Sequence, residues 1–196
     1  MKIPEGNFRA YLFDCDGTIS DSMPLHYEAW LKALKPWNCT MPEELHYEWA
    51  GRTPETIVGM LNQKYGLNMP PQLVAHNREV HFLEILPTVR SIPEVEAIIR
   101  SHHQKIPFAI VSGSPRKSIL QTLTYLDLKS YFNVIVGAED YAKGKPSTEP
   151  FLTAAQKLGI APQDCLVFED AELGFQSAAA AGMKWVKIPS PYERKS

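Results

Sequence analysis

Residues 8–18 read FRAYLFDCDGT, a short apolar run that ends in two aspartates one residue apart. The run 10–13 predicts a buried strand, and Gly17 breaks it. The alternating spacing turns Asp14 and Asp16 to one side of the chain and Cys15 to the other. Two carboxylates placed together either repel each other or share a divalent cation such as Mg²⁺. An Asp-x-Asp pair also occurs in calcium loops and in ordinary turns, so the rest of the chain must decide.

Three later segments place polar residues where an apolar run ends or a helical pattern begins. The run 106–111 is followed by Ser-Gly-Ser at 112–114, and Gly-Lys-Pro at 144–146 opens a helical pattern. The run 165–168 ends in Glu169 and Asp170. The carboxyl ends of parallel strands are where open α/β sheets bind ligands. All four segments are therefore candidates for one site.

Taken in order, the four segments resemble the motifs of the haloacid dehalogenase-like hydrolases, most of which are phosphatases. The resemblance covers most of the chain. It is closest to the beta-phosphoglucomutase-like group, and most like its bacterial sugar phosphatases. It implies a Rossmann-like parallel sheet with helices on both faces, a small inserted helical cap domain and Mg²⁺ as cofactor.

The hydrophobic pattern agrees with this α/β organisation. Apolar residues fall at helical spacing over 25–34, 54–65 and 71–86, with no convincing strand between about Ser22 and Pro87. We therefore predict a catalytic core of residues 1–21 and 88–196, a helical cap domain of residues 22–87, and hinges at 19–23 and 87–92.

Helices and strands alternate after Ile92, which predicts a parallel sheet. We expect Ser114 to cap the helix that begins at Pro115, and Gly182 to end the last long helix. The predicted strands are 108–111, 134–136, 166–168 and 185–188, and the predicted helices are 95–102, 115–126, 149–158 and 173–181.

Composition narrows the class of protein. The 44% hydrophobic content suits a globular fold with a full core, and the net charge of −2 offers no basic field for nucleic acid or an anionic membrane. No run approaches the length of a membrane span. The three cysteines show no C-x-x-C spacing, so neither a disulfide framework nor a zinc site is indicated. We expect a cytoplasmic monomer whose partner is a small phosphorylated metabolite.

The resemblance assigns a catalytic role to each aspartate of the first motif. Asp14 is the expected nucleophile and forms an aspartyl-phosphate, as carboxylates do in related phosphoryl transfer. Asp16 is expected to protonate the leaving oxygen and then to deprotonate water. A carboxylate at Asp16 separates the phosphatases of the family from the dehalogenases.

The same resemblance implies the metal ligands and the groups that hold the phosphoryl oxygens. Asp14, the backbone carbonyl of Asp16, Glu169 and Asp170 are expected around Mg²⁺, and Asp170 is the more certain of the acidic pair. Lys145 offsets the crowded negative charge. It fits better than Lys143 because Pro146 follows it, although Ser-Thr-Glu at 147–149 departs from the family's Lys-Pro-x-Pro-Asp. The expected phosphoryl-binding groups are Ser112, Gly113, Ser114 and Thr18.

The cap is expected to supply substrate contacts. His26 matches a histidine that faces the active site in the beta-phosphoglucomutase-like group, and Gly51 with Arg52 matches that group's cap loop. Arg78 replaces a cap lysine that assists acid catalysis in the mutase; arginine scarcely gives up its proton, so Arg78 is expected to bind anions only. Pro54 stands where the mutase holds a second phosphate with arginine. We expect surface positions for His46, His76 and His81.

The sequence is therefore interpreted as a Mg²⁺-dependent phosphoric monoester hydrolase for a small sugar phosphate of the fructose 1-phosphate or 6-phosphogluconate type. A phosphosugar mutase is the first alternative, disfavoured by Pro54 and Arg78. A non-catalytic regulator on the same fold is the second, disfavoured because a pure binder has no need of Asp16.

Overall fold

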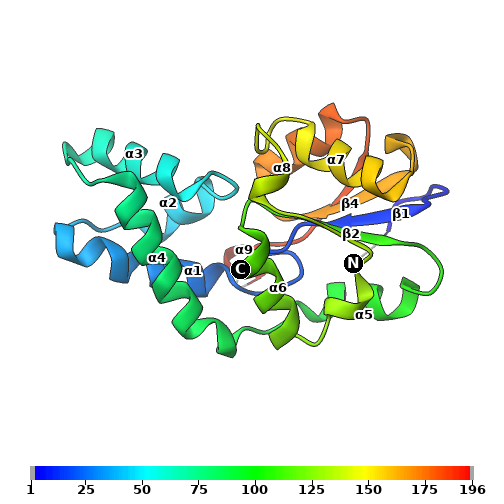
Figure 1. Ribbon diagram of the computed structural model, residues 1–196, viewed down its shortest axis with the longest axis horizontal. Coiled ribbons are helices and arrows are strands. Elements are labelled where there is room, and N and C mark those ends of the chain that lie inside the picture. Colours follow the sequence, from blue (N-terminus) through cyan, green and yellow to red (C-terminus); the bar gives the residue numbers. More distant parts are fainter. Residues whose placement is uncertain (1–2, 195–196) are drawn as a thin grey trace.

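A parallel sheet forms the centre of the protein in the computed structural model, which describes residues 3–194 (Figure 1). The strand order is β3-β2-β1-β4-β5, and each pair of neighbours is parallel. This confirms the predicted Rossmann-like class. The strands are β1 (Ala10–Phe13), β2 (Phe108–Val111), β3 (Val134–Val136), β4 (Cys165–Glu169) and β5 (Lys184–Lys187).

Helices cover both faces of the sheet (Figure 1). On one face, Tyr11 and Phe13 of β1 pack into a core with residues of α5 and α6; on the other, Ala10 and Leu12 pack with residues of α7 and α8. Because both faces are covered, the strands read as continuous apolar runs. The helices are α5 (Pro93–His102), α6 (Arg116–Tyr125), α7 (Glu149–Leu158) and α8 (Glu172–Ala180).

Of the five α-helices that lie between β1 and β2 in sequence, the first four lie to one side of the sheet in space (Figure 1). We call residues 23–88 the helical block. Trp30, Leu61 and Val74 are buried in a core that the block forms from its own residues. The predicted domain bounds stay a prediction, and residues 1, 2, 195 and 196 lie outside the described residues. The block contains α1 (Met23–Leu34), α2 (Glu43–Glu48), α3 (Pro54–Tyr65) and α4 (Pro71–Ile85).

The two segments that connect the helical block to the sheet run side by side. Ser20 and Ser91 form an antiparallel bridge. The backbone N–H of Asp21 donates to the carbonyl of Arg90 over 2.8 Å, and that of Ile92 donates to the carbonyl of Ile19 over 2.9 Å. The predicted hinges coincide with these two adjacent segments, which are the covalent link between the helical block and the sheet.

Most helices and strands lie within two residues of their predicted bounds, with two exceptions and one wrong cap. Helix α2 and the short α9 (Pro191–Arg194) were not expected, because so few residues carry no readable period. Helix α6 begins at Arg116 with Pro115 as its N-cap, and Ser114 does not cap it, since its hydroxyl bonds elsewhere. Gly182 follows α8 with φ +74°, a conformation that suits glycine.

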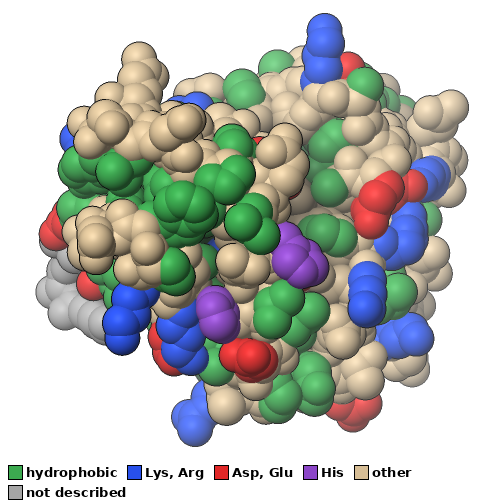
Figure 2. All heavy atoms as spheres, turned by 60° about the vertical axis from the view of Figure 1, so that its left-hand side comes forward, with side chains coloured by type: hydrophobic (Ala, Val, Ile, Leu, Met, Phe, Trp, Pro, Cys, Tyr) green, Lys and Arg blue, Asp and Glu red, His purple; other side chains and the backbone are tan. Residues whose placement is uncertain are grey.

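The surface carries apolar and charged side chains together. Figure 2 brings the side of the helical block forward, and apolar side chains gather on part of this face with charged side chains of both signs beside them. Leu73 is 50% exposed and Val80 is 41% exposed on α4. Within residues 3–194, no helix is both long and apolar enough to cross a membrane.

Candidate active site

The strand order places three carboxylates at one end of the sheet. Strands β2 and β3 lie to one side of β1, whereas β4 and β5 lie to the other, so the order reverses between β1 and β4. Phe13 of β1 is in register with Phe168 of β4. The next residues, Asp14 and Glu169, therefore emerge beside each other. Oxygens of Asp14, Glu169 and Asp170 all lie within 4.8 Å of one another.

The three carboxylates carry more negative charge than Lys145, the lysine that contacts them, can offset. Lys145 Nζ donates to Asp14 Oδ1 and to Glu169 Oε2, each over 2.6 Å. Burial and the charge of Glu169 still raise the pKa of Asp14 well above its usual range and the pKa of Asp170 to about 8. Burial opposes the charge of Lys145, but the two carboxylates outweigh it and raise its pKa. The site therefore retains uncompensated negative charge, which a bound cation would offset.

The cluster fits a hard divalent cation. Its donors are carboxylate oxygens, which Mg²⁺ prefers. Two glycines leave space for them: a Cβ at Gly17 would lie 2.2 Å from Asp170 Oδ2, and a Cβ at Gly174 would lie 2.0 Å from Glu169 Cδ. Any other residue at these positions would displace a carboxylate. The carboxylate of Asp16 lies outside the cluster, so its expected ligand atom, the backbone carbonyl, stays a prediction.

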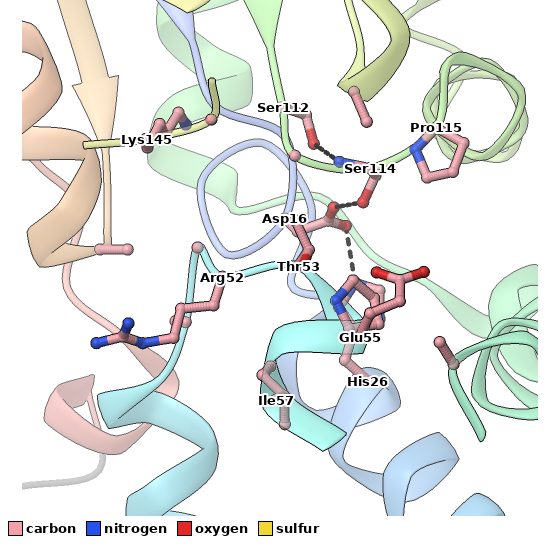
Figure 3. A pocket seen from close by; sticks show the side chains of 18 of the residues that line it. Asp16, His26, Arg52, Thr53, Glu55, Ile57, Ser112, Ser114, Pro115 and Lys145 are labelled. Carbon is pink, nitrogen blue, oxygen red and sulfur yellow. Dashed lines mark hydrogen bonds and ion pairs between the residues drawn. The ribbon is translucent and has the colours of Figure 1, made fainter. Parts of the chain in front are cut away.

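Asp16 has surroundings opposite to those of Asp14. Its Oδ1 accepts hydrogen bonds from His26 Nε2 at 3.0 Å and from Ser22 Oγ at 2.8 Å, and its Oδ2 accepts one from Ser114 Oγ at 2.7 Å (Figure 3). Burial raises the pKa of Asp16, but His26 and the two hydroxyl donors outweigh burial and hold it below the usual range. The ionised form of Asp16 is therefore stabilised.

His26 reaches Asp16 from α1 in one defined tautomer. Arg78 Nη2 contacts His26 Nδ1, and a guanidinium can only donate hydrogen bonds. Nδ1 must therefore accept, which leaves the proton on Nε2, facing Asp16. Burial and the charge of Arg78 lower the pKa of His26. The ring also stacks on Phe82, with centroids 3.9 Å apart.

Arg78 is held inside the helical block. It is 9% exposed, its Nη1 lies 3.0 Å from Glu79 Oε2, and its guanidinium lies over the rings of Trp30 and Phe82. Glu79 in turn accepts a hydrogen bond from the Ser118 hydroxyl on α6. A chain of contacts therefore runs from Asp16 through the block and back to the sheet's helices.

A cavity of about 550 Å³ separates the strand ends from the helical block. The size is typical of small-ligand sites. From the sheet it is lined by Asp14, Asp16, Ser112, Gly113 and Ser114, together with Lys145, Glu169 and Asp170; from the block it is lined by His26, His46, Gly51, Arg52, Thr53, Glu55, Ile57, Gln72, His76, Arg78 and Glu79, among others.

The chain matches the family model of haloacid dehalogenase-like hydrolases over residues 11–188. It belongs to this family. It is 31% identical over 182 residues to fructose-1-phosphate phosphatase YqaB of Escherichia coli, which covers 92% of this chain and 96% of that protein. It is 29% identical over 180 residues to the phosphorylated carbohydrates phosphatase of Thermotoga maritima, which covers 89% of this chain and 82% of that protein.

The fold of this hydrolase is also that of a mutase. The crystal structure of beta-phosphoglucomutase from Clostridium difficile matches it with a TM-score of 0.84 at 23% identity, over 96% of this chain and 87% of that one. At this identity the likeness concerns the fold alone. The family match confirms the prediction of a hydrolase, and the phosphatase names of its relatives agree with the predicted phosphoric monoester hydrolase.

Two of the predicted substrate-binding residues of the hydrolase make side-chain contacts that the sequence did not predict. Thr18 was expected to bind the phosphoryl group through its backbone amide, and that contact stays a prediction; its hydroxyl donates to Asp170 Oδ1 over 3.0 Å and so positions a carboxylate of the cluster. Arg78 was also expected on substrate, but Glu79 and His26 hold its guanidinium. Thr18 and Asp170 are 152 residues apart and Arg78 and His26 are 52 apart, whereas Glu79 is the sequence neighbour of Arg78.

His46 is not a surface residue. It is 5% exposed, its Nε2 lies 3.0 Å from the backbone carbonyl of Met23, and burial lowers its pKa to about 3. The unexpected helix α2 carries it to the cavity wall. His76 is exposed but also lines the cavity, whereas His81 lies on α4 within 3.3 Å of Glu84.

The remaining predicted residues lie around the strand ends. Ser112 is buried, and its Oγ accepts a hydrogen bond from the Ser114 N–H over 3.1 Å (Figure 3). Gly113 is exposed, with open space at its Cβ position. Gly51 takes φ +83° beside Leu173, and the Arg52 side chain points away from Asp16 (Figure 3).

Sequence reasoning missed four residues that shape the site. Ser22 supports Asp16, Tyr141 donates its hydroxyl to the carbonyl of Ser112 over 3.0 Å, Glu79 holds Arg78, and Glu55 lines the cavity. Only Glu55 had a local signal, since it follows Pro54 in the loop already assigned to the cap. Ser22 and Tyr141 act on partners 6 and 29 residues away, and Glu79 acts on its neighbour Arg78, but no motif or hydrophobic period marked any of the three.

Proposed function

We propose that this hydrolase is a Mg²⁺-dependent phosphatase of a small phosphorylated sugar, acting through an aspartyl-phosphate at Asp14. One observation carries the proposal: Asp14 and Asp16, one residue apart, lie in opposite surroundings. Asp14 faces Lys145 and two carboxylates, whereas Asp16 faces three hydrogen-bond donors. Two carboxylates in contrasting environments are the usual basis for two catalytic roles in one site.

In the first half-reaction an oxygen of Asp14 attacks the phosphorus of the ester. The new O–P bond replaces the bond from phosphorus to the sugar oxygen, which leaves with a proton from Asp16. The ammonium of Lys145 and the hydroxyl of Ser112, both on the cavity wall, are placed to stabilise phosphoryl oxygens.

In the second half-reaction Asp16 takes a proton from water, which attacks the aspartyl-phosphate and releases phosphate. Hydrogen bonds from His26, Ser22 and Ser114 favour the ionised Asp16, which is the form that this step needs. The first half needs Asp16 protonated. Movement of the helical block, which carries His26, would remove one donor and favour that form, as lid movement does in other enzymes.

The metal would be held by Asp14, Glu169 and Asp170, together with the backbone carbonyl of Asp16. When bound, Mg²⁺ neutralises charge on the phosphoryl group and on these carboxylates. The raised pKa values of Asp14 and Asp170 support this assignment, because repulsion by Glu169 is, after burial, the next largest cause of both.

Hydrolysis is favoured over a phosphosugar mutase. Arg78 is ion-paired with Glu79 and contacts His26, so its charge is already offset by a neighbouring carboxylate, and Pro54 offers no cation. Incubation with beta-glucose 1-phosphate, Mg²⁺ and a bisphosphate primer should release inorganic phosphate. Accumulation of glucose 6-phosphate with little free phosphate would favour the mutase instead.

The proposal is tested by phosphate release from p-nitrophenyl phosphate and from a panel of phosphorylated sugars that includes fructose 1-phosphate and 6-phosphogluconate. We expect turnover that requires Mg²⁺ and stops in excess chelator. No turnover on any phosphate ester would favour the non-catalytic regulator.

A further inference from the structure

Glu55 places an unpaired carboxylate on the wall of the cavity opposite the strand ends. It lies in the first turn of α3, and its carboxylate extends into the cavity near His26 (Figure 3). Among the described residues it has no hydrogen-bond or ion-pair partner. Its charge reaches Arg78 deeper in the block. A substrate held at Asp14 by its phosphoryl group would extend its other end toward this wall.

Three lysine and arginine side chains line the cavity among the described residues, and two of them are already paired with carboxylates. Arg78 is ion-paired with Glu79 at 3.0 Å and contacts His26. Lys145 is committed to Asp14 and Glu169 at the strand ends. Arg52 is exposed, and its guanidinium points away from Asp16 (Figure 3). Of the two glutamates that line this wall, Glu79 is paired with Arg78, which leaves Glu55 as the unpaired carboxylate where the substrate's sugar would extend.

We infer that the enzyme selects monophosphates of uncharged sugars or sugar alcohols, with Glu55 as the residue that sets this preference. A carboxylate accepts hydrogen bonds from sugar hydroxyls, and such charge-assisted bonds are the stronger kind. The same carboxylate repels a second phosphate or a sugar-acid carboxylate. The inference rests on the proposed function and narrows it: a substrate of the fructose 1-phosphate type is preferred to one of the 6-phosphogluconate type.

The test compares two substrates that differ only in the group at one end of the chain, which is uncharged in one and negatively charged in the other. Glucitol 6-phosphate ends in an alcohol where 6-phosphogluconate ends in a carboxylate, and both are open chains. We expect a higher kcat/KM for the alcohol in the Mg²⁺-loaded wild-type enzyme. Because Glu55 is exposed to solvent, added salt should narrow the difference. Equal values, or a preference for the carboxylate, would overturn the inference.

Glu55→Gln should narrow this preference by about fivefold, the effect of one unit charge acting on another at about 4 Å in water. Glu48→Gln is the matched control: it removes the same charge from an exposed position of the helical block that does not line the cavity. It should leave the wild-type preference in place. Circular dichroism and the unfolding midpoint establish that both variants fold.

The outcomes separate the two levels of the proposal. If wild type hydrolyses p-nitrophenyl phosphate and both open-chain substrates equally, the phosphatase stands and the role of Glu55 falls. If the preference exists but Glu55→Gln does not change it, another residue sets it and the inference again falls. If wild type releases phosphate from no ester, the proposed function itself fails.

Discussion

The two walls of the cavity differ in how their residues are held. On the sheet side, Asp14, Lys145 and Glu169 are nearly or fully buried and joined by contacts of 2.6 Å. On the side of the helical block, Arg52 and Glu55 are exposed, and neither has an ion-pair partner among the described residues. The register of neighbouring strands positions the first group, whereas loop and helix packing positions the second. In the proposed reaction, the buried wall carries the chemistry and the exposed wall carries the choice of substrate.

One chain of contacts joins the two walls. Asp16 bonds to His26 on α1, His26 contacts Arg78 on α4, and Glu79 bonds to Ser118 on α6. Any shift of the helical block relative to the sheet has to break or lengthen one of these contacts. The position of the helical block is therefore coupled to the protonation state of Asp16, which lies on the sheet side of the cavity.

The largest expected effect comes from a substitution on the sheet side of the cavity, at Asp14. Asp14→Asn should lower turnover of p-nitrophenyl phosphate by about 10⁴-fold or more, as loss of a nucleophile does in other enzymes, because a neutral amide cannot attack phosphorus. Phosphate release measures it. Asp164→Asn, at the opposite end of β4, is the control and should keep wild-type turnover. Near-wild-type turnover in Asp14→Asn would exclude the covalent route.

Asp170→Asn should weaken the metal site while leaving the cavity shape intact. The amide removes the anionic ligand but keeps the volume, and the loss of Mg²⁺ affinity should exceed the about 10–100-fold typical of outer-shell changes. Mg²⁺ titration of turnover gives the apparent affinity. Full activity in excess chelator, in this variant or in wild type, would contradict the metal assignment.

Arg78→Met tests the coupling between the walls. Without Arg78, His26 is free to carry its proton on Nδ1, and Glu79 loses its cation. We expect kcat for p-nitrophenyl phosphate to fall by about 10–100-fold, part of the contribution of general acid–base catalysis, with a smaller change in KM and a shifted pH profile. Arg78→Lys should recover part of kcat. A change in KM alone would indicate a substrate contact instead.

The smallest expected effect concerns stability without metal. Folded Asp170 titrates at about 8 rather than 3.8, so between these values the unfolded chain binds fewer protons and the free energy of unfolding falls as pH rises. Buried His46, with its pKa lowered from 6.5 to about 3, opposes this only below pH 6.5.

The unfolding midpoint of metal-free protein should therefore fall between pH 6.5 and about 8. Mg²⁺ should raise the midpoint more at pH 8 than at pH 6.5, because it competes with protons for the same carboxylates. Asp170→Asn should flatten the pH dependence. A midpoint that rises with pH in chelator would contradict the crowding of the three carboxylates.

The sequence by itself determined that the protein has a parallel sheet and which polar residues follow its strands. Apolar runs of four or five residues followed by Asp, Ser or Glu are local patterns, and parallel strands bring their ends to one edge. One cavity is therefore lined by the six residues that the sequence predicts for the site: Asp14, Asp16, Ser112, Lys145, Glu169 and Asp170.

Only the tertiary structure decided the contacts made by the helical block. Arg78 meets His26 across 52 residues, and Ser118 meets Glu79 across 39. Such pairs depend on how each helix is rotated and where it crosses its neighbours, and a hydrophobic period gives neither. The same reason moved Ser114 from a helix cap to Asp16 and His46 from the surface to the cavity wall. Local pattern identifies the chemistry, and packing decides which groups tune it.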